Sequence, residues 1–170
     1  MDGSGTTDVI YLGAGEVQVY VNQSGNSLAA PVSIVGLPRI DSVATFGVTD
    51  LLGTGTGCLV WSSPLPQAGG AQVRYIDLLD SRKPYLMMGV DNGRGLSTSI
   101  EYAPSTFYYL ADRAAGRPWR TRLPFVVQTV RRVEQHDVVA DTRQTQRYWY
   151  RHGVYDSRER EFRGFDLVEQ

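Results

Sequence analysis

The feature that most constrains the fold is a pattern that occurs twice, fifty residues apart. Residues 2–11 and 52–61 each contain a glycine-punctuated turn with small oxygen-bearing side chains, which runs directly into an apolar strand ending in an aromatic residue. The turn glycines are Gly3, Gly5, Gly53 and Gly55. A repeat of this period, with one turn and one strand in each copy, is typical of β-propeller blades. Propellers have about four to eight blades, so two copies predict a piece of a larger array.

Short segments with strand-like alternation fill most of the chain. The predicted strands are residues 8–12, 16–22, 32–35, 42–46, 59–62, 73–78, 85–90, 96–102, 126–135 and 142–151. One short helix is predicted at residues 105–115, where Gly116 supplies a stop. Residues 64–71, rich in proline and glycine, are the best linker candidate. The sequence therefore predicts an all-β fold with one helix, divided into residues 1–66 and 72–170.

Composition excludes several classes of protein. The 17 basic and 18 acidic side chains leave a net charge of −1, which gives no electrostatic reason to bind nucleic acid or an acidic membrane. The single cysteine, Cys58, excludes an internal disulfide and any multi-cysteine metal site. No apolar run approaches the ~18 residues that a membrane span needs, and the N-terminus has no signal-peptide pattern. We therefore expect no direct membrane insertion.

Three segments carry a resemblance to a known family. Residues 2–12 look like an FG-GAP-type propeller loop, and residues 84–95 and 148–165 look like the middle region of the B component of insecticidal Tc toxin complexes. The last segment, with Gly-x-Tyr-Asp followed by Arg-Glu-Phe-Arg-Gly-Phe, also resembles the opening of a shell of tyrosine- and aspartate-containing (Rhs-type) repeats. Its motif residues are Tyr148, Tyr150, Tyr155, Asp156, Arg160, Glu161, Phe162, Gly164 and Phe165.

This resemblance implies an architectural role without enzymatic activity. In the family, a propeller docks on the pore-forming A component and gates the exit. The repeat strands join those of the C component in a hollow shell that encloses a toxic polypeptide. Residues 1–66 would then be the last propeller blades, and residues 72–170 the first β-strands of the Rhs-type shell. The resemblance also implies synthesis in the bacterial cytoplasm and action outside the cell, as part of a much longer protein.

The first glycine loop is the candidate metal site. Oxygens of Asp2, Ser4 and Asp8 could hold a structural calcium ion in the manner of an EF-hand loop. In the second loop Cys58 replaces the closing aspartate. Calcium usually takes about six to eight oxygen ligands, several of them charged. The residues therefore favour a turn in which side chains bond to backbone amides, with calcium left open in the first loop. No other cofactor is predicted.

Three other functions have partial support. Arg94, residues 97–99 and residues 159–161 superficially match the arginine, Ser-Thr-Ser and Glu-x-Glu elements of ADP-ribosyltransferases, but the arginine stands too close to the serines. Arginines interleaved with aromatic rings between residues 108 and 132 could bind nucleic acid, although stacking on those rings within a wall is simpler. A free-standing β-domain that binds a protein or glycan is the third alternative. Neither His136 nor His152 lies near a nucleophile in the sequence.

Overall fold

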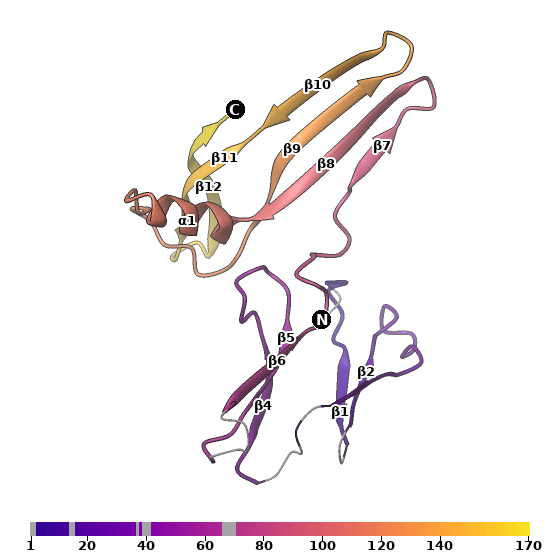
Figure 1. Ribbon diagram of the computed structural model, residues 1–170, viewed down its shortest axis with the longest axis vertical. Helices are drawn as coiled ribbons and strands as arrows, with labels where there is room; N and C mark the ends of the chain where they lie inside the picture. Colours follow the sequence, from indigo (N-terminus) through magenta and orange to yellow (C-terminus); the bar gives the residue numbers. More distant parts are fainter. Residues whose placement is uncertain (1–2, 14–15, 37, 39–41, 66–70) are drawn as a thin grey trace. The chain divides into compact units, whose positions relative to one another are not determined.

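The computed structural model describes residues 3–13, 16–36, 38, 42–65 and 71–170 (Figure 1). The strands are antiparallel and a single helix occurs among the described residues, which confirms the predicted all-β class. Among these residues, no helix has the length and apolar composition to cross a membrane. The chain divides into two compact units, Met1–Tyr85 and Leu86–Gln170.

The first unit contains two three-stranded antiparallel sheets. The first sheet comprises β1 (Val9–Leu12), β2 (Glu16–Tyr20) and β3 (Val32–Val35), and the second comprises β4 (Thr45–Thr49), β5 (Cys58–Ser62) and β6 (Val73–Asp77). In both sheets each strand pairs with the next one along the chain, so each sheet is a simple meander. The two glycine loops of the repeat lead into β1 and β5.

The two sheets of the first unit share one aliphatic core. Val17 and Val19 of β2 are buried, whereas the residues that alternate with them are half-buried, so β2 turns one face inward. Leu59 of β5 is fully buried in the same cluster. Burying such a side chain contributes about 1.5–3 kcal/mol. The shared cluster means that the two sheets pack against one another.

The second unit combines a sheet, a helix and a hairpin. The four-stranded sheet has the order β10-β9-β8-β7. Its strands are β7 (Gly89–Asp91), β8 (Leu96–Pro104), β9 (Gln128–Asp137) and β10 (Thr142–Arg147), and β11 (Trp149–Asp156) pairs with β12 (Glu161–Glu169). The helix α1 (Ser105–Ala114) follows β8 directly and contacts β11. It lies at the end of the sheet opposite the β7–β8 turn (Figure 1).

An aromatic core holds α1 against the β11–β12 hairpin. Tyr108 of α1 is fully buried, and its ring centroid lies 5.1 Å from that of Trp149 in an edge-to-face contact. Trp119, after the helix, makes the same kind of contact with Phe165 of β12 at 6.0 Å. Such ring pairs add about 0.5–1.5 kcal/mol beyond the area that they bury. A Cβ at Gly153 would lie 2.3 Å from Leu123 Cδ1, so the hairpin backbone packs directly against the Leu123 side chain, and any larger residue at 153 would clash with it.

The structure places the division of the chain later than residues 66–72. The strand β6 lies in the region predicted to begin the shell, but it pairs along its whole length with β5. A hydrogen bond from the Ser63 amide to the Gln72 carbonyl, 3.0 Å, closes the connection between these strands. Residues 64–71, of which 66–70 lie outside the described part, therefore connect two strands of one sheet. Strand pairing decides the boundary here, whereas the linker prediction used only local proline and glycine content.

Several strand boundaries also differ from those predicted. The strand expected at residues 42–46 is β4, which begins three residues later. The strand expected at 142–151 divides at Tyr148, where the chain leaves β9 and begins to pair with β12. Of the strand expected at 85–90, only the end is part of β7. The strand β12 was not among the predicted strands, and it begins within the alternating charges of residues 158–163.

Candidate functional site

The second glycine loop is held by one carboxylate. Asp50 Oδ1 accepts a hydrogen bond from the Thr54 amide at 2.9 Å, and its Oδ2 accepts one from the Gly55 amide at 2.7 Å. Gly53 and Gly55 have φ angles of 66° and 79°, which a residue with a Cβ rarely adopts. The hydroxyl oxygens of Thr54 and Thr56 lie 2.7 Å apart. These bonds fix the turn that leads into β5.

The first glycine loop repeats part of this arrangement. The hydroxyl oxygens of Ser4 and Thr6 lie 2.8 Å apart, as in the second loop, and Gly3 and Gly5 also have positive φ angles. Asp8 Oδ1 accepts a hydrogen bond from the Asn22 amide at 2.9 Å. The third candidate calcium ligand, Asp2, lies outside the described residues. No group of three or more histidine, cysteine, aspartate or glutamate residues in the described part is placed to hold a metal, and calcium stays a prediction.

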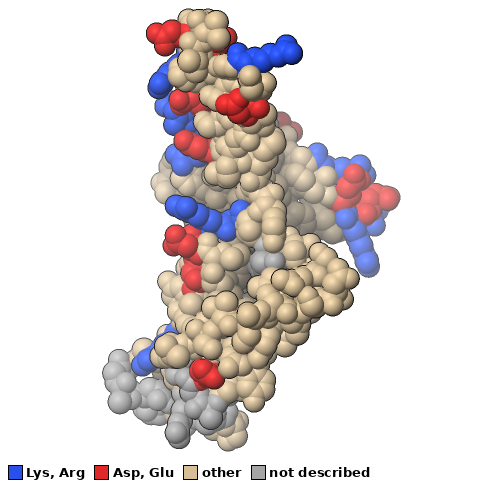
Figure 2. All heavy atoms as spheres, turned by 90° about the vertical axis from the view of Figure 1, so that its right-hand side faces the viewer, with Lys and Arg blue, Asp and Glu red and all other residues tan. Residues whose placement is uncertain are grey.

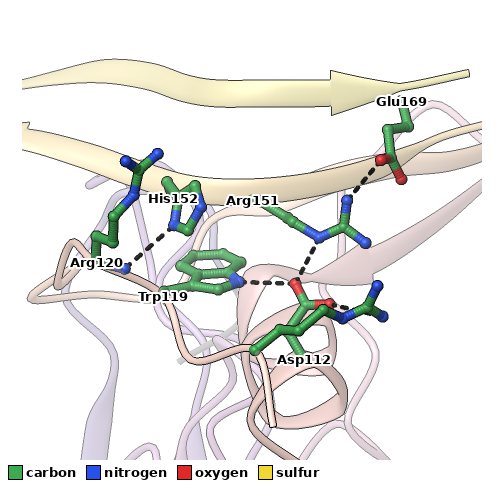
Figure 3. A network of polar contacts seen from close by, with 7 residues as sticks. Asp112, Trp119, Arg120, Arg151, His152 and Glu169 are labelled. Atoms are coloured by element: carbon green, nitrogen blue, oxygen red, sulfur yellow. Dashed lines mark hydrogen bonds and ion pairs between the residues drawn. The ribbon is translucent and has the colours of Figure 1, made fainter. Parts of the chain in front are cut away.

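The most extensive polar network of the second unit surrounds Asp112 of α1 (Figure 3). Its side chain is fully buried. Asp112 Oδ2 accepts hydrogen bonds from Trp119 Nε1 at 3.1 Å and from Arg151 Nε at 3.0 Å, while Arg117 Nη2 lies 3.8 Å from Oδ1. Arg151 Nη1 also pairs with Glu169 at 2.7 Å. The network thus connects α1, the segment after it, β11 and β12.

The charges of this network stabilise one another. Burial alone would raise the pKa of Asp112, but the hydrogen bonds from Trp119 and Arg151 and the charge of Arg151 together lower it. Burial would likewise lower the pKa of Arg151, whereas its bonds to Glu169 and Asp112 raise it. Both groups are therefore charged at neutral pH. Asp112 consequently serves as a buried counter-ion and does not exchange protons near neutrality.

A histidine contact lies beside this network. His152 of β11 has φ 54°, an uncommon value for a residue other than glycine. Its Nδ1 accepts a hydrogen bond from the Arg120 amide at 3.2 Å, and its ring contacts that of Trp119 (Figure 3). Arg120 Nη2 in turn lies 3.4 Å from Asp166 of β12. His152 therefore holds the segment after α1 against the hairpin.

The tyrosine and phenylalanine residues of the C-terminal motif build the hairpin's packing. Tyr150 donates from its hydroxyl to the Val130 carbonyl at 2.9 Å, and its ring centroid lies 5.0 Å from that of Phe165. The Tyr155 ring contacts Phe125 at 5.3 Å, and Phe162 contacts both Phe125 and Phe165. Tyr148 donates its hydroxyl hydrogen bond to Gln146.

The polar residues of the same motif shape the β11–β12 turn. Asp156 Oδ1 accepts hydrogen bonds from the amides of Arg158 and Glu159, at 2.9 and 3.2 Å. These two hydrogen bonds lower the pKa of Asp156, and the charge of Arg163 lowers it further. Arg160 has φ 55° at the end of the turn, and Glu161 pairs with Arg163 at 2.8 Å. Gly164, at φ 96°, lies at a register shift between the two strands.

The structure separates the residues that resembled an ADP-ribosyltransferase site. The Arg94 amide donates to Asn92 Oδ1 in the β7–β8 turn, and Ser97 pairs with His136 near that turn. Glu161 instead lies at the start of β12, opposite Asp156 in the β11–β12 ladder. The β7–β8 turn is at the end of the sheet away from α1, and the hairpin packs beside α1 (Figure 1). The three elements do not form a common site.

Sequence reasoning missed the Asp112 network. Asp112 lies four residues after Tyr108, so both side chains belong to the same face of the helix. A carboxylate one turn after a large ring on the same helix face was the available signal, because a buried charge requires partners. The identity of Arg151 as that partner could not be read, since 39 residues separate it from Asp112.

The comparisons with known proteins define the family. A family model described as the insecticide toxin TcdB middle/N-terminal region matches residues 22–170. The chain belongs to this family of Tc toxin B components, as the sequence motifs predicted. No match is found among curated protein sequences.

Solved structures of such complexes resemble both units. A crystal structure of TcdB2–TccC3–Cdc42 matches 99% of this chain with 30% identity and a TM-score of 0.84. TcdB2–TccC3 without its hypervariable C-terminal region gives 29% identity and a TM-score of 0.82 over 99% of the chain. The Photorhabdus luminescens Tc holotoxin pore gives 30% and 0.83 over 98%. In each case this chain spans 8% of the length of the solved chain.

Proposed function

We propose that this chain forms part of the container that a Tc toxin complex builds around a toxic polypeptide. The first unit contributes blades of an FG-GAP-type propeller, and the second contributes the opening strands of a Rhs-type shell. The match to TcdB2–TccC3, at 30% identity over 99% of this chain, carries the proposal. The partners are a C component similar to TccC3, the pore-forming A component and the enclosed polypeptide, outside the cell.

The architecture of the first unit supports the propeller assignment. Its two sheets are meanders of neighbouring strands that pack through one aliphatic cluster. Propellers consist of small antiparallel sheets repeated around an axis, with each sheet packed on the next. The two glycine loops share the contact between hydroxyl oxygens two residues apart. The loops precede β1, the first strand of its sheet, and β5, the middle strand of the other, so it is the likeness of the loops themselves that supports a blade repeat.

The features of the second unit support a role in the wall of the proposed shell. Its motif residues are engaged in packing and turn formation, as described above, and the Asp112 network fixes the helix to the hairpin. The candidate enzymatic residues lie in separate places. We therefore propose a structural, non-enzymatic role, with neither nucleic acid nor membrane insertion involved.

A chimera tests the proposal. The segment of TcdB2 that matches this chain is replaced by residues 1–170, and the chimera is co-expressed with TccC3. We expect it to co-purify with TccC3 as a soluble complex that encloses its cargo. As a matched control, the same segment is replaced by a shuffled sequence of identical composition, which should abolish assembly. If circular dichroism shows that the 170-residue chain is folded but the chimera does not bind TccC3, the result would favour a free-standing binding domain.

A further inference from the structure

A β-bulge in the second unit directs two consecutive arginines to one place. Along the β8–β9 ladder Glu101 pairs with Arg132 and Tyr102 pairs with Val130, so Arg131 is an extra residue on β9. In a regular strand, neighbouring side chains point to opposite faces, and a bulge changes that alternation. The bulged carbonyl of Arg131 accepts a hydrogen bond from the Tyr148 amide at 2.9 Å, which holds the bulge in place.

The bulge opens onto a pocket that we name the arginine pocket. It has a volume of about 450 Å³, and its lining includes Arg131, Arg132, Arg147, Tyr148, Trp149 and Glu101. Arg147 of β10 stands directly opposite Arg132 in the β9–β10 ladder. Like charges at directly opposite positions of a sheet destabilise it. The arrangement therefore needs negative charge nearby.

The chain supplies only part of that negative charge. Arg132 pairs with Glu101 at 3.0 Å and with Glu134. Within the described part of the chain, Arg131 and Arg147 have no ion-pair partner, and Arg131 instead lies over the Phe107 ring at 4.7 Å. The Nε of Arg132 is buried and has no hydrogen-bond partner among the described residues. The pocket thus offers unused hydrogen-bond donors and unbalanced positive charge.

The Asp112 network shows which ligand such groups hold in this molecule. There, arginine and tryptophan side chains donate to a carboxylate. The arginine pocket offers the same side-chain types, but Glu101, the carboxylate among its lining residues, pairs with Arg132 and leaves Arg131 and Arg147 without an ion-pair partner from the residues that the structure describes. We propose that the arginine pocket binds an acidic side chain of another polypeptide segment. The guanidinium fork of Arg147 or Arg131 matches a carboxylate in two parallel hydrogen bonds, and the rings of Tyr148 and Trp149 pack on the methylene stem.

The test uses the 170-residue chain and side-chain NMR signals at low ionic strength, because salt screens an exposed pair. The probe is acetyl-Gly-Glu-Gly-amide, with acetyl-Gly-Gln-Gly-amide as its neutral match and inorganic phosphate as a free oxyanion. We expect the glutamate peptide, but not the glutamine peptide, to shift the Arg132 Nε–H and Trp149 indole N–H signals. The Trp61 indole, in the other unit, serves as the internal reference.

Two substitutions of equal charge locate the site. Arg147→Gln should weaken the response about tenfold, whereas Arg143→Gln on the same strand should leave it unchanged. Equal responses to the two peptides, equal effects of the two variants, or binding of phosphate alone would each overturn the proposal. If Arg147→Gln does not fold, Arg147→Lys decides, because it keeps the charge but loses the fork and should still weaken binding. The measurement requires no assembled toxin, so its outcome is independent of the chimera experiment.

Discussion

The two units of this chain bury different kinds of side chain. The buried cluster of the first unit is aliphatic, formed by Val17, Val19 and Leu59, although Trp61 is also buried in that unit. The second unit instead buries a cluster of large rings together with a charged carboxylate, Asp112. Charge is distributed accordingly: the first unit has four basic and seven acidic residues, and the second has thirteen and eleven. On the face that Figure 2 shows, charged side chains are more crowded over the second unit than over the described part of the first. Apolar burial should therefore dominate stability in one unit, and paired charges should matter more in the other.

This difference also concerns geometry. An aliphatic cluster stabilises two sheets without specifying directions, since the hydrophobic effect is non-directional. A buried ion pair costs desolvation energy and is often no more stable than an apolar replacement. The network of Asp112, Arg151 and Glu169 does, however, join three elements at defined angles. We infer that fixing α1 against the hairpin is the main contribution of this network.

The largest effect is expected when Asp112 is removed. Asp112→Ala leaves Arg151 and Trp119 buried without their acceptor, and should lower the free energy of unfolding of the second unit by about 3–5 kcal/mol. Hydrogen exchange resolved by residue can measure this for each unit separately. Arg117→Gln is the control, because that side chain is 66% exposed and its loss should cost at most about 1 kcal/mol. Equal losses in the two variants would refute a buried ionic anchor.

A somewhat smaller effect is expected from the aliphatic core. Leu59→Ala should lower the free energy of unfolding of the first unit by about 2–4 kcal/mol through lost burial and the cavity left behind. Val48 lies directly opposite Leu59 in the ladder but is 46% exposed, so Val48→Ala should cost less than about 1 kcal/mol. Exchange in the second unit should not change in either variant. A matching loss there would mean that the two units unfold together.

The sequence predicted best those features that depend on nearby residues. The glycine loops, most strands and the helix follow from composition and spacing within about ten residues. The sequence predicted β6 as a strand but grouped it with residues 72–170. It belongs to the first unit because it pairs with β5 across a connection rich in proline and glycine. The strand β12 was not predicted because it begins with alternating charges, which lack the apolar alternation typical of a strand. In the structure two of these charges, Glu161 and Arg163, form an ion pair.

The candidate sites divide in the same way. Local pattern sufficed to single out Asp8 and the glycines of the first loop, but it could not show that Asn22 bonds to Asp8. The arginines between residues 108 and 132 were noticed as a basic stretch. The bulge that brings Arg131 and Arg132 into one pocket with Arg147 depends on the register of three strands. No pattern within a single strand specifies that register.

Acid should weaken the second unit more than the first through Asp112. Its pKa in the folded chain lies below the usual value near 3.8. The stabilisation is therefore fully present above the unfolded pKa and is lost as pH falls through the lowered folded pKa. Comparing the chain with Asp112→Asn by urea unfolding across this range isolates the contribution. The difference between the two should shrink as pH falls, and a constant difference would exclude titration of Asp112 as its source.

A modest effect is expected at the second glycine loop. Asp50→Ala removes the acceptor for the amides of Thr54 and Gly55, and should lower the free energy of unfolding of the first unit by about 1 kcal/mol because the loop is exposed to water. Asp50→Asn keeps one acceptor oxygen and should lose about half as much. Thermal unfolding of both variants measures the difference. Wild-type stability in Asp50→Ala would show that the glycines alone maintain the turn.

Calcium should have the smallest effect and it tests whether the two glycine loops are equivalent. Asp8 already accepts a hydrogen bond from the Asn22 amide, and Ser4 bonds with Thr6, as Thr54 does with Thr56 in the second loop. If the first loop is likewise a hydrogen-bonded turn, adding about 1 mM calcium after chelation will not change the unfolding temperature of the first unit. A rise that Asp8→Asn abolishes would instead establish a calcium site there. The loops would then differ in function, because Cys58 stands in the second loop where the first has its closing carboxylate.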